Sequence, residues 1–117
     1  MKSAKVIQQL FKEGKSLANF PIRVIYLETI QGSSPLQAGF TVNKKNFKKA
    51  VDRNRVKRLM RESYRIQKND LKNELIQSNK NLALFFIYTG KELPDHKLIF
   101  EKTGNVLSRI EKTIFPK

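Results

Sequence analysis

An uninterrupted apolar run, LALFFIY from Leu82 to Tyr88, is the feature that most limits how this chain can fold. A short continuous run with aromatic residues, followed closely by a glycine such as Gly90, is typical of a strand buried on both faces. It is far shorter than the roughly 20 apolar residues that cross a bilayer, so no membrane span is expected. The run therefore predicts a central strand covered by other elements.

The residues before this strand show both helical and strand patterns. Residues 3–13 have apolar side chains at helical spacing and precede Gly14, which predicts a short amphipathic helix with a C-terminal glycine. Residues 22–27 and 36–43 have strand composition and flank a cluster of turn residues. We expect these two strands to form an antiparallel hairpin.

Two longer helices are predicted beside the strands. Residues 47–67 contain neither Gly nor Pro and predict the longest helix, with a weak helical continuation over 68–80 and a break near Asn69-Asp70 as the alternative. A last helix begins near Asp95 and carries one apolar face, formed by Ile99, Thr103, Val106, Leu107, Ile110 and Ile114. The expected fold class is α+β, a small sheet packed with helices in the order α-β-β-α-β-α, in a single domain over residues 1–117.

Composition restricts the class of partner. The 117 residues include 24 Lys and Arg against 10 Asp and Glu, a net charge of +14 that favours a polyanionic partner. The chain has no cysteine and a single histidine, His96, which excludes a disulfide framework and the usual zinc sites. The N-terminus lacks the apolar core of a signal peptide, so a cytoplasmic protein is expected.

The excess charge is concentrated between Lys44 and Lys68. Eleven basic residues in this stretch face only two acidic residues, a net +9. On a helix, the i, i+4 spacing forms a ridge of like charge, comprising Arg53, Lys57, Arg61 and Arg65. Such pairs destabilise an isolated helix by about 0.2–0.5 kcal/mol each, and a bound phosphate backbone would reverse that effect. The stretch predicts an RNA- or DNA-binding surface, with a solvated helix face and a membrane-surface helix as weaker alternatives.

The aromatic residues have two interpretations. Some could stack on unpaired bases, as in proteins that bind single strands, while most are expected in the core. Phe85 and Phe86 must point to opposite faces of their strand. No Ser/His/Asp set, phosphate loop or carboxylate cluster is found, so no catalytic or metal-ligating residue is predicted within the protein.

Three segments resemble one known family. The sequence AVDRNRVKRLMRE, from Ala50 to Glu62, resembles the signature of the bacterial ribonuclease P protein subunit. The segments GFTVNKK, from Gly39 to Lys45, and LFKEGKS, from Leu10 to Ser16, are similar to the same family. The resemblance extends from about residue 4 to the strand at 82–88, and the last helix matches only in pattern.

The resemblance implies a mixed sheet of the four-stranded type with a left-handed βαβ crossover that contains the basic helix. It also implies partners: the ribonuclease P RNA, bound by the basic helix, and precursor tRNA, whose single-stranded 5′ leader lies in a cleft between the first helix and the sheet. Mg²⁺ would serve hydrolysis by the RNA. The expected function is that of the ribonuclease P subunit that promotes endonucleolytic 5′ maturation of tRNA, as a monomeric protein in a ribonucleoprotein enzyme.

The resemblance also assigns residues by position. The RNA-binding group comprises Lys44, Lys45, Lys48, Arg53, Asn54, Arg55, Lys57, Arg58, Arg61 and Arg65. The leader-binding group comprises Ile7, Phe11, Tyr26, Thr41 and Asn43. The Asn54 amide suits either RNA or neighbouring backbone, and Arg55 lies toward the apolar arc, where a structural role is the alternative. Ile7 stands where the family often has an aromatic residue, and a one-residue slip would move Tyr26 to the other face.

Functions from other classes compete with this interpretation. Composition alone favours a ribosomal or general RNA-binding protein, and only the motif separates the two. A DNA-binding helix-turn-helix protein would need a short helix-turn pair before residue 47, where strands are predicted instead. A nuclease made of protein alone would need an acidic or histidine cluster that the sequence lacks.

Overall fold

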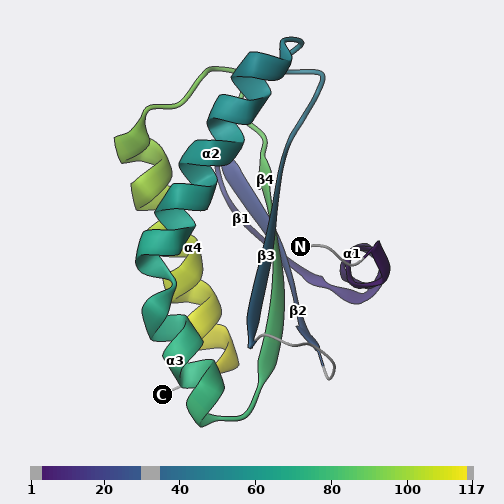
Figure 1. The fold of residues 1–117 in the computed structure, drawn as a ribbon, viewed down its shortest axis with the longest axis vertical. Helices are drawn as coiled ribbons and strands as arrows, with labels where there is room; N and C mark the ends of the chain where they lie inside the picture. Colours follow the sequence, from purple (N-terminus) through teal and green to yellow (C-terminus); the bar gives the residue numbers. More distant parts are fainter. Residues whose placement is uncertain (1–3, 30–34, 116–117) are drawn as a thin grey trace.

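A computed structural model describes residues 4–29 and 35–115, with side chains for residues 8–28 and 35–115. The elements, in chain order, are α1 (Ala4–Glu13), β1 (Lys15–Asn19), β2 (Ile22–Thr29), β3 (Leu36–Val42), α2 (Ala50–Gln67), α3 (Asn69–Gln77), β4 (Asn81–Tyr88) and α4 (His96–Ile114). The strands form one mixed sheet in the order β1-β2-β4-β3, with α1 on one side and α2, α3 and α4 on the other (Figure 1).

The apolar run forms the inner strand β4, as predicted. β4 pairs antiparallel with β2 and parallel with β3. Its alternate residues Leu82, Leu84 and Phe86 are at most 1% exposed. Because neighbouring side chains on a strand point to opposite faces, these residues face one layer of helices while Phe85 and Ile87 face the other side. Phe85 and Phe86 therefore point in opposite directions, as expected.

The larger part of the core lies between the sheet and helices α2 and α4. From α2 it receives Val56, Met60 and Tyr64, and from α4 it receives the predicted face, of which Ile99, Thr103, Val106, Leu107 and Ile110 are all buried. Asp95 caps α4, since its side chain accepts a hydrogen bond from the backbone of Leu98 at 2.8 Å. The amphipathic pattern thus decided correctly which side of α4 is buried.

On the other face of the sheet, α1 is held by Leu10, which is fully buried. Gly14 ends the helix, and its backbone N–H donates to the Leu10 carbonyl at 2.8 Å. A Cβ atom at Gly14 would overlap that carbonyl oxygen and the side chain of Ile25 on β2. Only glycine permits so close an approach of α1 to the sheet.

The expected hairpin between the second and third strands is wrong. β4 lies between β2 and β3, which do not pair with each other. The turn residues before β3 permit a hairpin but do not require one, and β4 is the most apolar strand, which gains most from an inner position. β3 and β4 are parallel and are connected through α2 and α3. This βαβ connection is the one that the resemblance expects to be left-handed.

The α+β class and the mixed four-stranded sheet are confirmed, with two elements added to the expected order. β1 pairs antiparallel with β2 and, with the polar sequence KSLAN, has no apolar alternation to signal a strand. α3 is a separate helix after a break at Lys68, which agrees with the alternative of a break near Asn69-Asp70 rather than with a continuous helix. The observed order is α-β-β-β-α-α-β-α.

The longest helix also differs from expectation in two details. It begins at Ala50, because Phe47 is buried as part of the preceding loop (6% exposed). Its buried side comprises Val56, Met60, Ser63 and Tyr64, whereas Ile66, expected on the apolar arc, is 50% exposed. Ile66 therefore lies off the buried side of the helix, although the next residue, Gln67, still bonds to the Phe100 carbonyl of α4.

Candidate nucleic-acid interface

The loop before α2 is ordered by three polar side chains. Asn43 accepts a hydrogen bond from the backbone of Lys45 at 3.0 Å, which closes a turn at the end of β3. Asn46 donates to the carbonyls of Thr89 and Gly90, which ties the loop to the end of β4. Arg53 donates from Nη1 to the carbonyls of Phe47 and Lys48. The loop therefore presents its lysines from a fixed backbone.

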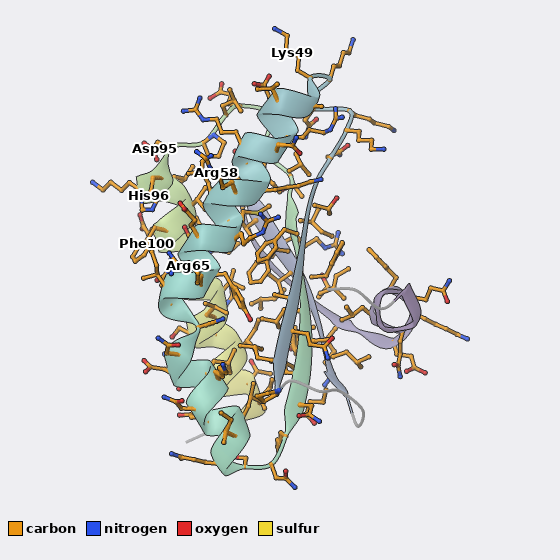
Figure 2. The ribbon with its side chains drawn as sticks, in the orientation of Figure 1. Lys49, Arg58, Arg65, Asp95, His96 and Phe100 are labelled. Atoms are coloured by element: carbon orange, nitrogen blue, oxygen red, sulfur yellow. The ribbon has the colours of Figure 1, made fainter. Side chains whose placement is uncertain are left out.

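This loop and the outer side of α2 carry the predicted basic group, which we call the basic surface. Its exposed members are Lys44, Lys45, Lys48, Asn54, Arg55, Arg58, Arg61 and Arg65, and its half-buried members are Arg53 and Lys57. Within residues 4–29 and 35–115, no carboxylate lies within ion-pair distance of these cations, and the ion pair between Lys80 and Glu28 is on other elements. Among the described residues, the cations of the basic surface are therefore not held in ion pairs; Figure 2 labels two of them on α2, Arg58 and Arg65.

Two members of the basic surface, Asn54 and Arg55, were expected to have one of two roles, and a third, Arg53, has a structural role that was not expected. Arg53 braces backbone, as described, so part of its donor capacity is already used. Arg55 is exposed, which places it with the solvent-facing cations rather than in the core. Asn54 is also exposed, and among the described residues it forms no hydrogen bond with neighbouring backbone. Its amide is free to face a ligand.

A groove separates α2 from the edge strand β3. It has a volume of about 580 Å³, and three cations line it beside Phe40 and Tyr64: Arg61 and Arg65 of α2, and Lys68 directly after that helix. The Arg61 guanidinium lies over the Phe40 ring, 6.0 Å from its centroid, and the Lys68 ammonium lies over the Tyr64 ring at 5.6 Å. Lys68 was not among the predicted residues, although it continues the spacing Arg61, Arg65 by one further turn.

The other face of the sheet forms a shallow aromatic site with α1. Phe11 of α1 is 57% exposed and meets Phe85 of β4 edge to face, with ring centroids 5.4 Å apart. Thr41 pairs with Ile87, which shares a face with Phe85, so Thr41 lies on this face too. Phe11 and Thr41, which come from two separate segments that resemble the family, are thus on the same side of the sheet. We call this face the α1 face.

The remaining leader-binding residues are placed differently. Tyr26 pairs with Leu84, and so it lies on the face that α2 and α4 cover, packed against the core. This is the one-residue slip considered from the sequence, since Ile25, and not Tyr26, is the residue that pairs with Phe85. Asn43 is exposed beyond the end of β3 and closes the turn at Lys45. The side chain of Ile7 lies outside the described residues.

Two residues of the α1 face were missed. Phe85 forms its floor, and Arg23 pairs with Ile87, is exposed, and donates from Nε to Ser16 Oγ at 3.0 Å. Strand alternation could have indicated both residues. Arg23, Ile25 and Leu27 share one face of β2, and Ile25 pairs with Phe85, so Arg23 and Phe85 lie on the same face of the sheet. Arg23 supplies positive charge beside the aromatic pair.

Other chemistry has little support from the arrangement of side chains. In the part of the chain that the structure describes, no three His, Asp or Glu residues gather where they could hold a metal ion. No described helix is long and apolar enough to cross a membrane.

Two tyrosine hydroxyls have raised pKa values. Burial raises the pKa of the Tyr64 hydroxyl. The pKa of the Tyr88 hydroxyl is raised mainly by burial and to a smaller extent by the negative charge of Glu92. Both phenols therefore keep their protons at neutral pH.

Comparison with known sequences gives one consistent family. A sequence model of the Ribonuclease P family matches residues 1–111. The ribonuclease P protein component of Porphyromonas gingivalis is 38% identical over 106 residues, which cover 89% of this chain and 77% of that protein. The ribonuclease P protein component of Chlorobium phaeobacteroides is 31% identical over 121 residues, covering 94% of this chain and 83% of that protein.

Solved structures agree with the fold. The ribonuclease P protein from Thermotoga maritima superposes with a TM-score of 0.74 at 29% identity, covering 93% of this chain and 94% of that one. The ribonuclease P protein of Staphylococcus aureus gives a TM-score of 0.76 at 22% identity, covering 94% and 93% of the two chains. The second likeness supports the arrangement of helices and strands described above.

Proposed function

Because this chain belongs to the bacterial ribonuclease P protein family and is the protein component of a ribonuclease P holoenzyme, we propose that its two surfaces serve different RNAs. The basic surface binds the ribonuclease P RNA. The α1 face binds the single-stranded 5′ leader of precursor tRNA. The protein thereby promotes endonucleolytic removal of the leader in the cytoplasm.

The placement of these surfaces on opposite sides of the sheet is the observation that carries the proposal. Among the described residues, the cations of the basic surface have no acidic ion-pair partners, which suits phosphates of a folded RNA. The α1 face has an exposed aromatic ring over a second ring, with Arg23 beside them, which suits an unpaired strand. One protein can therefore hold an enzyme RNA and a substrate leader at the same time.

The chain's own contribution to the reaction is electrostatic and positional. Phosphates that meet the basic surface lose part of their mutual repulsion, so the RNA can fold and hold its substrate with less added salt. Ribonuclease P holoenzymes use metal ions, and we assign Mg²⁺ to the RNA subunit, since the described protein residues offer no cluster of ligands for it. The side chains of the protein bind and orient RNA, and they take no part in proton transfer or attack.

The experiment that tests this proposal is cleavage of precursor tRNA by a bacterial ribonuclease P RNA at low Mg²⁺, with and without the protein. Two substrates are compared, one with a 5′ leader and one without. We expect the protein to restore cleavage at low Mg²⁺ and to increase affinity more for the substrate with a leader. Binding of the RNA without restored cleavage would instead identify a general RNA-binding protein.

A further inference from the structure

The groove between α2 and β3 has a layered aromatic wall. Phe40 of β3 stacks on Phe86 of β4, with ring centroids 5.2 Å apart and planes 13° from parallel. Tyr64 of α2 meets both rings edge to face, at 5.7 Å from Phe40 and 5.6 Å from Phe86. These contacts fix the Phe40 ring from within the core, so it offers a rigid support to anything placed above it.

The Arg61 guanidinium forms the outer layer of this wall. It lies over Phe40 and is exposed to solvent, and within the described chain no carboxylate is near enough to pair with it. A guanidinium is planar, and its face stacks well on aromatic rings and on nucleobases. A guanidinium held over a fixed ring is therefore a prepared surface for a further planar group.

The rest of the groove is suited to phosphate. Arg65, near the end of α2, and Lys68, directly after it, line the groove, and the described residues that line it include no acidic side chain. Lys68 is positioned over the Tyr64 ring, which keeps its ammonium group at the groove. The groove thus combines one planar cation with two cations that can reach the oxygens of a sugar-phosphate backbone.

We propose that this groove holds one unpaired nucleotide of the ribonuclease P RNA, with its base stacked on Arg61 and its flanking phosphates bound by Arg65 and Lys68. The inference rests on the proposed function and adds a specific contact to it. A duplex offers phosphates but no free base face, whereas a single extruded nucleotide offers both. Arg61 and Arg65 belong to α2, the helix of the basic surface, and Lys68 follows its last residue directly, which is the reason for assigning the nucleotide to the ribonuclease P RNA.

A substitution that keeps the charge tests the stack. Arg61→Lys retains the positive charge and loses the planar guanidinium, while Arg109→Lys makes the same exchange at an exposed arginine of α4, outside the basic surface. We expect Arg61→Lys to weaken binding of the ribonuclease P RNA by about 5- to 150-fold, the range found for one base stacked on an aromatic ring, with an unchanged salt dependence. Arg109→Lys should change the affinity by less than about twofold. Equal effects of the two variants would refute the stack.

The absence of cysteine in the sequence permits a direct location of the nucleotide. Lys68→Cys is labelled with a thiol-specific photocrosslinker and irradiated in the complex of protein, ribonuclease P RNA and precursor tRNA, and Ser108→Cys on α4 serves as the control. We expect a crosslink from position 68 to one unpaired nucleotide of the ribonuclease P RNA. A crosslink to the leader, to paired nucleotides only, or to no RNA would overturn the proposal.

An abasic residue at the crosslinked nucleotide completes the test. It should weaken binding of the wild-type protein and have little further effect on Arg61→Lys, because both changes remove the same stack. Independent, additive effects would contradict the contact. These measurements report RNA binding alone, so a failure of the proposed function, seen as no leader-dependent cleavage with wild-type protein, is distinguished from a failure of this site.

Discussion

Arg53 and Phe47 are joined by a hydrogen bond of 2.8 Å from the Arg53 guanidinium to the Phe47 carbonyl oxygen. Phe47 is buried against Tyr88, with ring centroids 5.9 Å apart, so its backbone is fixed by the core. Arg53 also donates to the carbonyl of Lys48, the next residue. The first arginine of the basic surface therefore links the first turn of α2 to a loop that is anchored in the core.

The variant Arg53→Gln is expected to lower the free energy of unfolding by about 1–2 kcal/mol, because it removes a charged donor from two backbone carbonyls. Arg58→Gln removes the same charge from an exposed side chain and should change stability by less than about 0.5 kcal/mol. Urea unfolding followed by circular dichroism measures both. Equal stabilities for the two variants would show that Arg53 does not brace the loop.

Arg58→Gln should instead affect RNA binding. If its guanidinium contacts a phosphate, the slope of log affinity for the ribonuclease P RNA against log salt should become less steep by about one unit. Lys112→Gln, on the exposed last turn of α4, is the matched control and should leave the slope unchanged. A titration series at several salt concentrations gives the answer, and identical slopes for all three proteins would remove Arg58 from the interface.

The α1 face predicts a contrast between two aromatic residues. Phe11→Leu removes the ring that meets Phe85 and should weaken binding of precursor tRNA with a leader by about 5- to 150-fold, the value of one stacked base. It should have little effect on a substrate without a leader. Tyr26→Leu changes a residue on the other face and should preserve the difference between the two substrates. The opposite pattern would return Tyr26 to the leader site.

The close contact between Gly104 of α4 and Gln67 of α2 predicts that the effect of a Gly104 substitution on stability depends on the residue at position 67. Gln67 donates to the carbonyls of Ser63 and Phe100, and a Cβ atom at Gly104 would overlap its side-chain oxygen. In a Gln67→Ala background, Gly104→Ala should raise the free energy of unfolding by about 1 kcal/mol, the helix propensity gain of alanine over glycine. In the wild-type background, Gly104→Ala should displace the Gln67 side chain, and the loss of its hydrogen bonds should offset a gain of about 1 kcal/mol, so that stability changes little. Equal effects in both backgrounds would contradict the close contact.

The buried Tyr64 hydroxyl predicts a decrease in stability at alkaline pH. Burial raises its pKa in the folded protein, so above pH 10, the usual value, the unfolded chain loses a proton that the folded chain retains. Stability from this group is complete below about pH 10 and falls as the pH rises toward the folded pKa. Tyr64→Phe should therefore lose less stability between about pH 9 and 11 than the wild type, as measured by thermal unfolding. Parallel curves would exclude Tyr64 as the cause.

Local patterns predicted the parts of the fold that depend on a single element. The apolar run gave β4, and the spacing of Ile99, Val106 and Ile110 gave the buried side of α4. Pairing between distant segments could not be read in the same way. Nothing in residues 22–43 shows that a strand formed 40 residues later will lie between β2 and β3. β1 escaped notice because its strand state depends on pairing with β2 and has little apolar content of its own.

The candidate site shows the same division. The charges of α2 were predictable because helical spacing alone places Arg58, Arg61 and Arg65 on the outer side of one helix. The α1 face depends on sheet register, and there Tyr26 was assigned in place of Ile25. The groove depends on both helical spacing and sheet register, because its walls come from α2 and β3. The sequence could not show it, since it also depends on the packing of Phe40 against Phe86.

The position of β4 within the sheet has a consequence for the order of events during synthesis. A ribosome makes β1 and β2 first, and these can pair as a local hairpin. β3 and α2 follow, but each lacks its main packing partner until β4 has been made and α4 has closed over the sheet. The basic surface is therefore present on the nascent chain before the core beneath it is complete. Pairing of segments so distant in sequence is slow, so an RNA that meets α2 early would encounter a helix still searching for its final packing.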